Sequence, residues 1–197
     1  MSPSTTLRAV NDLPTAPAVL ADSTVILVDY QVTYTTGVME LEGWEPALDA
    51  AADLLARARS AGSTVVHVVH DGGSGTPYDI SAPIGQVHER VAPIDGEAVV
   101  VKNAPNAFVG TDLGDLVDAA GHADVVVAGF MTHMCVTFTA EGAFLRGNRP
   151  TVVADASATR SLPGVDGPVA ARDLHRAALA TVGDLYAVVV PTAAELG

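Results

Sequence analysis

One cysteine, one lysine and one aspartate are the residues of this sequence that could do chemistry together. Cys135 is the only cysteine, so no disulfide forms within the chain, and a deprotonated thiol is a strong nucleophile. Lys102 is the only lysine, and lysine, unlike arginine, can lose its proton when it is desolvated. Asp29 could take the thiol proton or hold the lysine. Each also has an ordinary explanation: an inert buried thiol, a solvated surface lysine and a carboxylate that caps a loop.

The surrounding elements predict that these residues meet at one edge of a sheet. Asp29 ends the apolar run 24–30, Lys102 ends the run 98–102, and Cys135 follows the run 124–130. The predicted strands are 24–30, 64–70, 98–102, 124–130, 151–156 and 186–190, and the predicted helices are 46–61, 112–120, 134–146 and 168–182. This alternation predicts an α/β chain with a three-layer αβα, Rossmann-like fold. Its six-stranded, mostly parallel sheet is covered by helices on both faces, and such sheets bind ligands beyond the carboxyl ends of their strands.

Cys135 is expected in the first turn of the helix 134–146. Unpaired amides and the helix dipole at that position favour a thiolate. The glycine in the preceding GFMTHMC segment also allows backbone amides to face an oxyanion. Position alone fits an inert buried thiol better, and the GFMTHMC turn shifts the interpretation toward a nucleophilic role.

The chain is expected to form one domain over residues 23–197, preceded by an arm over residues 1–22. The arm is rich in Ser, Thr, Pro and Ala, and is either disordered or laid over the surface. The stretch 71–97 is rich in glycine and proline and too long for a simple connection, which is typical of a lid or a binding loop.

Composition limits the partners. The formal net charge is -13, which disfavours nucleic acid and anionic membranes, so a small molecule is the expected partner. No run resembles a signal peptide or a membrane span, and a cytoplasmic location is expected. The GGSGTP segment (72–77) lacks the Lys of a phosphate loop. His67 and His70 should face opposite sides of one strand, so they cannot share a metal, and no partner is assigned to His88, His122 or His175.

Four motifs in this order resemble the isochorismatase-like cysteine hydrolases. They are VDYQ (28–31), VKNAPNAF (101–108), GFMTHMCV (129–136) and VADASATR (153–160), within a resemblance that spans about residues 23–190. The resemblance implies a catalytic triad of Asp29, Lys102 and Cys135. It also implies a cis peptide between Phe130 and Met131, with an oxyanion hole made of the Met131 and Cys135 amides. The implied reaction is attack on a carbonyl carbon, loss of an amine or ammonia, and hydrolysis of a thioester.

The departures from the family narrow the expected activity. The region 34–49 lacks the D-x-H metal motif of nicotinamidases, so no catalytic metal or other cofactor is expected and nicotinamide becomes an unexpected substrate. The presence of Cys135 argues against the vinyl-ether hydrolysis of siderophore-type members. Asn106 replaces the serine that often precedes Ala-Phe, which affects the local pocket contacts and not the triad.

The sequence therefore predicts a hydrolase of non-peptide C–N bonds that acts on a small amide, carbamoyl or lactam compound. Candidate substrate-binding residues, chosen by their proximity to the motifs, are Tyr30, Gln31, Tyr34, Trp44, His70, Phe108 and His133. A vinyl-ether hydrolase, a non-catalytic binding module and a structural subunit of an oligomer stay as alternatives. A homodimer or homotetramer is expected, and the sequence does not choose between them.

Overall fold

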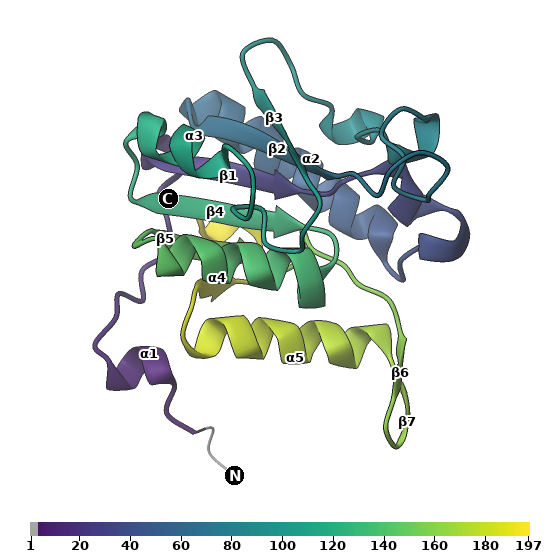
Figure 1. Cartoon of the computed structure of the whole chain (residues 1–197). Helices are drawn as coiled ribbons and strands as arrows, with labels where there is room; N and C mark the ends of the chain where they lie inside the picture. The colour runs from purple at the N-terminus through teal and green to yellow at the C-terminus, as the bar shows by residue number, and fades with distance from the viewer. Residues whose placement is uncertain (1–3) are drawn as a thin grey trace.

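Six short apolar strands form one parallel sheet in the computed structural model, which describes residues 4–197 (Figure 1). The strands are β1 (Ser23–Val28), β2 (Thr64–His70), β3 (Ala98–Lys102), β4 (Asp124–Gly129), β5 (Arg149–Val153) and β8 (Val188–Val190). Their order across the sheet is β3-β2-β1-β4-β5-β8, and all five pairings are parallel. The predicted parallel sheet is therefore confirmed, with strand ends that differ from the expected ones by up to three residues.

Helices cover both faces of this sheet, as predicted (Figure 1). The helices are α1 (Leu7–Val10), α2 (Trp44–Ala61), α3 (Leu113–Ala120), α4 (Thr137–Leu145) and α5 (Ala171–Asp184). Single turns of 3-10 helix lie at Leu20–Asp22, Val32–Thr35, Gly37–Met39, Pro83–Gly85, Glu89–Val91 and Ala193–Glu195. The side chains of β1 show the layering: Val25 and Leu27 pack with α2, whereas Ile26 and Val28 pack with α3 and α4. Both faces of the central strand are thus buried, which explains its unbroken apolar sequence.

The chain order reverses between β1 and β4. From β1 the chain first builds outward to β2 and β3, then returns to β4 beside β1 and continues to β5 and β8. Val28 at the end of β1 is in register with Gly129 at the end of β4. At such a switch point the loops after the two central strands diverge and leave a crevice, which is where open α/β sheets bind ligands.

The predicted helix 168–182 was wrong at its start. Residues 162–169 form a two-stranded antiparallel hairpin, β6 (Leu162–Gly164) with β7 (Gly167–Val169), and α5 begins only at Ala171. Pro168 resembles a helix-starting proline in the sequence, but here it lies in a short isolated strand, where a missing backbone donor is tolerated. The hairpin projects from the body of the protein, with Val165 fully exposed near its tip (Figure 1).

The expected start of the helix at 134 was also wrong. Residues Thr132–Val136 form a π-helical turn, in which the Val136 amide donates to the Met131 carbonyl at 3.3 Å, and α4 begins at Thr137. Cys135 therefore lies in this turn instead of the first turn of an α-helix. Such turns are frequent at functional sites because they redirect side chains without ending the helix.

The described part of the N-terminal arm lies against the sheet and α5. The Leu7 amide donates to Asp184 at 2.9 Å, Arg8 donates to the Leu185 carbonyl at 2.8 Å, and the buried Ala18 donates to the Thr151 hydroxyl at 3.0 Å. Within residues 4–197, no helix combines the length and the apolar character needed to cross a membrane.

Candidate active site

Lys102 contacts both of the other residues that the sequence singled out, Asp29 and Cys135. Its Nζ lies 2.7 Å from Oδ2 of Asp29 and 3.3 Å from Sγ of Cys135. The side chains of Lys102 and Asp29 are completely buried, and Cys135 is 6% exposed. A buried ammonium is tolerated only when it is paired, so the lysine and the carboxylate depend on each other. The structure thus brings all three residues into one contact group at the carboxyl edge of the sheet.

Strand register and one left-handed residue position this group. Lys102 ends β3 in register with His70 at the end of β2, and His70 Nδ1 lies 3.4 Å from the lysine Nζ. Asp29 follows β1 with a φ of 54°, and its amide donates to the Val68 carbonyl at 2.9 Å. Aspartate tolerates this left-handed conformation better than most residues. The backbone thus leaves the strand at the residue that must meet Lys102.

The end of β4 requires a glycine. Gly129 has a φ of 154°, and a Cβ there would lie 2.1 Å from the Val28 carbonyl oxygen, so no side chain fits. One residue further on, the peptide between Phe130 and Met131 is cis, which confirms the cis peptide expected from the sequence. The π-helical turn that contains Cys135 follows directly, so the ends of β1 and β4 lie close together just before Cys135.

The electrostatics favour a protonated thiol at rest. Burial and, to a smaller extent, the Asp29 charge raise the pKa of Cys135, Lys102 opposes both, and the net pKa is about 12. Burial also raises the pKa of Asp29, again opposed by Lys102. The sequence-based expectation that a helix start favours the thiolate was therefore wrong, because the thiol is buried next to a carboxylate. The arrangement suits a thiol that gives its proton to Asp29 during the reaction.

Aromatic rings surround the group. Tyr34 is buried, with its ring 5.7 Å from that of Phe130 and 5.8 Å from that of Tyr78. The Tyr78 ring also lies 5.0 Å from the His70 ring. Tyr78 comes from the long stretch 71–97 and was not among the predicted site residues, because a loop sequence does not show which part of the fold the loop packs against. Of the predicted substrate-binding residues, Tyr34 and His70 lie beside the triad.

Two other predicted substrate-binding residues, Tyr30 and Gln31, have different contacts. Tyr30 is buried and donates its hydroxyl to the Ala156 carbonyl. The Gln31 side chain donates to the His70 and Gly85 carbonyls at 3.0 and 2.7 Å and accepts from the His70 amide at 2.9 Å. Its amide is fully engaged, so it holds the 71–97 stretch to the strand ends instead of binding substrate.

Trp44 begins α2 and packs into the core on that side of the sheet, with its ring 6.2 Å from that of His88. No polar contact within residues 4–197 ties it to the triad. Phe108 packs with the α3 and α4 side, under the Arg146 guanidinium at 5.4 Å. His133, in the turn of the nucleophile, is half-buried, and its Nδ1 lies 2.5 Å from the Thr159 hydroxyl.

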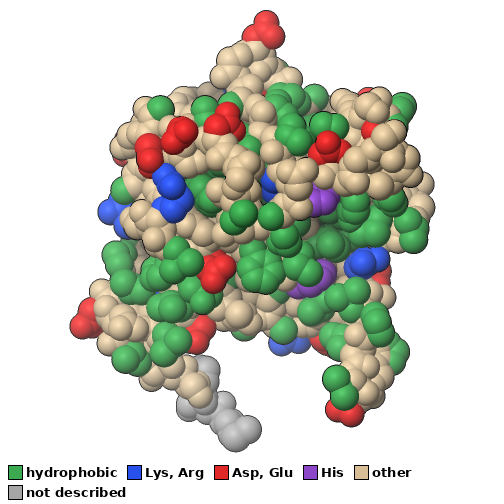
Figure 2. Space-filling model, viewed as in Figure 1, with side chains coloured by type: hydrophobic (Ala, Val, Ile, Leu, Met, Phe, Trp, Pro, Cys, Tyr) green, Lys and Arg blue, Asp and Glu red, His purple; other side chains and the backbone are tan. Residues whose placement is uncertain are grey.

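Arg160 is a second residue that sequence reasoning missed. Burial lowers the pKa of His133 and raises the pKa of Tyr78; the Arg160 charge adds to the first shift and opposes the second, so Arg160 lies near both. Its Nε is buried without a hydrogen-bond partner, and no ion pair is found for it among the described residues. The available signal was its position, since it ends the VADASATR motif just after β5 at the same edge of the sheet. Figure 2 shows histidine side chains at the surface near this edge, where the strands of Figure 1 end.

His67 faces the opposite side of β2 from His70, as predicted. Its Nε2 lies 2.8 Å from Glu97, whose carboxylate also accepts two hydrogen bonds from Arg59 at 2.7 and 2.8 Å. These Arg59 bonds are the main reason that the pKa of Glu97 falls to about 2. The cluster ties α2 to the end of the 71–97 stretch. Over residues 4–197, no three His, Cys, Asp or Glu side chains are grouped as metal ligands would be.

Comparisons with known proteins identify the family of this chain. The isochorismatase domain profile matches residues 23–194. A secreted isochorismatase effector of Verticillium dahliae is 32% identical over 93% of this chain and 95% of its own length. A streptothricin hydrolase of Streptomyces noursei is 35% identical over 95% of this chain and 76% of its own length.

Solved structures show the same fold. The crystal structure of an isochorismatase from Pseudomonas putida superimposes with a TM-score of 0.95 at 37% identity, covering 99% of this chain and 100% of that one. The chain belongs to the isochorismatase family of hydrolases, which includes amidohydrolases.

Proposed function

We propose that this protein is a cysteine hydrolase that cleaves a non-peptide C–N bond in a small amide, carbamoyl or lactam compound. One observation carries the proposal: a single buried Lys102 Nζ contacts both the Asp29 carboxylate and the Cys135 thiol. A nucleophile, a base and a cation are then within reach of one carbonyl group. A maleamate amidohydrolase of Pseudomonas putida, 34% identical over 66% of this chain, supports this class of bond.

The first half-reaction transfers the acyl group to sulfur. Asp29 takes the thiol proton, and the sulfur of Cys135 attacks the substrate carbonyl carbon. The Lys102 ammonium stabilises the developing thiolate, and the Met131 and Cys135 amides donate to the carbonyl oxygen as it becomes negative. The C–N bond then breaks, the leaving nitrogen takes the proton from Asp29, and an acyl thioester stays on Cys135.

The second half-reaction releases the acid. Asp29, again a carboxylate, takes a proton from a water molecule, whose oxygen attacks the thioester carbon. The C–S bond breaks, the sulfur recovers the proton, and the carboxylic or carbamic acid leaves. Asp29 thus moves one proton in each direction in each half-reaction, which requires it to stay unprotonated at rest, with Lys102 opposing the effect of burial on its pKa.

Arg160 suggests a substrate with an acidic group. Its guanidinium has no acidic partner among residues 4–197 and lies near Tyr78 and His133. A planar guanidinium binds a carboxylate through two parallel hydrogen bonds. We therefore expect Arg160→Met to raise KM for an acidic amide more than for a neutral one, whereas Arg149→Met, in an exposed pair with Asp124, should change neither.

The test is to trap the acyl-enzyme. The protein is incubated with a library of small amides, ureas and lactams, and its intact mass is followed, since Cys135 is the only thiol. An acyl adduct that is absent from Cys135→Ala, with turnover abolished and the fold intact, supports the proposal. Turnover of these compounds that survives in Cys135→Ala would refute the cysteine mechanism, and hydrolysis of a vinyl ether by that variant would instead indicate a vinyl-ether hydrolase. Binding without turnover, together with an unreactive thiol, would indicate a binding module.

A further inference from the structure

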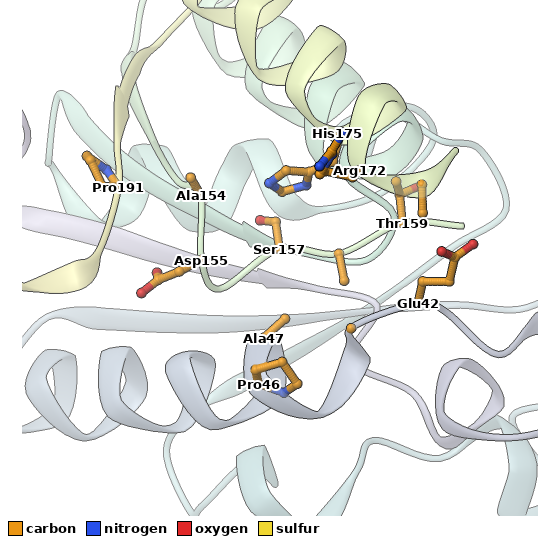
Figure 3. A pocket seen from close by; sticks show the side chains of 13 residues that line it. Glu42, Pro46, Ala47, Ala154, Asp155, Ser157, Thr159, Arg172, His175 and Pro191 are labelled. Carbon is orange, nitrogen blue, oxygen red and sulfur yellow. The ribbon is translucent and has the colours of Figure 1, made fainter. Parts of the chain in front are cut away.

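A cavity of about 510 Å³ lies at the carboxyl edge of the sheet, beside the segment that leads from β4 to the nucleophile (Figure 3). Its walls come from the start of α2, the loop after β5 and the first turns of α5. Its lining includes Ser157, Thr159 and His175, but none of the triad residues. In Figure 3, the His175 ring from α5 points toward Ser157 across the cavity.

Three side chains of this wall hold the segment 129–133. His175 Nδ1 lies 2.8 Å from the Thr132 hydroxyl, and the Thr159 hydroxyl lies 2.5 Å from His133 Nδ1. The Ser157 hydroxyl accepts a hydrogen bond from the Gly129 amide at 3.3 Å. The chain between the end of β4 and the nucleophile is therefore fixed by hydrogen bonds from the cavity side. His175 provides the only one of the three that comes from α5.

Thr132 is the central residue of this segment. It directly follows Met131, is 1% exposed, and its amide donates to the Ala158 carbonyl at 2.9 Å. The only side-chain partner of its hydroxyl within residues 4–197 is His175. A buried hydroxyl that loses its partner is destabilising, so the segment would move to satisfy it. A shift of about 1 Å near a reacting group can slow a reaction about 100-fold.

We propose that His175 is a positioning residue of the hydrolase, which holds Thr132 and thereby the Met131 amide in place for acyl transfer. This inference rests on the proposed function. His175 does not touch the reacting atoms, since the triad does not line its cavity. Its imidazole is half-buried, and burial lowers its pKa, which favours the neutral ring.

The experiment compares two reactions of Cys135. With p-nitrophenyl acetate, the sulfur attacks the ester carbonyl, the C–O bond to p-nitrophenolate breaks, and the thiol proton passes to Asp29, so the step needs an oxyanion hole. With iodoacetamide, the sulfur displaces iodide from a saturated carbon, and no oxyanion forms. Both adducts are followed by intact mass, which is unambiguous with a single thiol. The variants are His175→Leu, which removes the polar atoms, and His175→Asn, which keeps a polar atom near the position of Nδ1.

We expect His175→Leu to slow acetylation by about 10- to 100-fold while alkylation stays at the wild-type rate. His175→Asn should recover most of the acetylation rate. Arg172→Leu is the matched control, because Arg172 lines the same cavity from α5 but its side chain is 81% exposed. If His175→Leu does not fold, Thr132→Val removes the same hydrogen bond from the other side and should cause the same loss.

Three results would overturn the inference: wild-type acetylation in His175→Leu, an equal slowing of both reactions, or no recovery in His175→Asn. The second result would mean that His175 affects the thiol or its accessibility instead of the oxyanion hole. If wild-type protein neither forms an acetyl adduct at Cys135 nor releases p-nitrophenolate faster than Cys135→Ala does, the proposed function itself fails and this inference fails with it. That outcome is read without any His175 variant, so it is distinct from a failure that concerns only His175.

Discussion

Replacing Asp29 with asparagine should make Cys135 more reactive as a thiol and less effective as a catalyst. The Asp29 carboxylate raises the pKa of Cys135, and Lys102 opposes it. Asparagine has nearly the same shape but no charge. In Asp29→Asn the thiolate therefore faces the lysine without a competing carboxylate, while the base that accepts the proton during catalysis is lost.

The size of the effect follows from the two Lys102 contacts. Asp29 Oδ2 and Cys135 Sγ lie 2.7 and 3.3 Å from the same Nζ, so they are at most about 6 Å apart. Two unit charges at about 6 Å interact with roughly 3 kcal/mol at an effective dielectric constant of about 20. That corresponds to a Cys135 pKa about 2 lower in Asp29→Asn, and to about 100-fold more thiolate at pH 8.

The assay is iodoacetamide alkylation from pH 6 to 10.5, followed by intact mass, with Cys135→Ser as the blank. Wild-type alkylation should keep rising through about pH 10, well above the ordinary thiol pKa of about 8.5. Asp29→Asn should alkylate faster at pH 8 and yet turn over substrate more slowly. Lys102→Met should alkylate more slowly than wild type. Slower alkylation of Asp29→Asn at every pH would refute the reasoning, because the carboxylate would then stabilise the thiolate.

Three further variants test the fold and the site. Gly129→Ala places a Cβ 2.1 Å from a backbone oxygen of β1 and should lower the free energy of unfolding by about 3 kcal/mol or more, whereas Gly110→Ala, with open space around it, should cost about 1 kcal/mol; equal urea midpoints would contradict this. Glu97→Gln should destabilise the protein at pH 7, because hydrogen bonds from Arg59 lower the pKa of Glu97 to about 2. The stability that this carboxylate contributes is present above about pH 4.5 and is lost as the pH falls toward 2. In acid unfolding, the variant should therefore lose less stability than the wild type over that range. Lys102→Arg keeps the charge but needs more room in a fully buried site, so turnover should be lost, and near-normal kcat would contradict a specific role for the ammonium.

The sequence by itself determined the architecture and the three central residues of the candidate site. Each strand is a short apolar run, because a parallel strand that is covered on both faces buries the side chains of even-numbered and odd-numbered positions alike. Asp29 and Lys102 end two such runs and Cys135 follows a third, and in a parallel sheet the carboxyl ends share one edge. These properties are local, so a single chain shows them without any knowledge of its packing.

Sequence patterns gave the wrong element where one segment fits two kinds of secondary structure. Pro168 favours a helix start, but the glycines on both sides of a short turn produce a hairpin, and α5 starts three residues later. Cys135 follows β4 closely, but the chain forms a π-helical turn before α4. The choice depends on contacts with the loop after β5, which is distant in sequence.

Only the tertiary structure decided how the site works. It placed one ammonium between a carboxylate and a thiol, and the burial of all three reversed the expected direction of the Cys135 pKa. It also brought Tyr78 and Arg160 beside the triad, and gave His175 a partner in Thr132. Desolvation and charge interactions depend on distances between segments far apart in the chain, and residue types and spacing do not contain those distances.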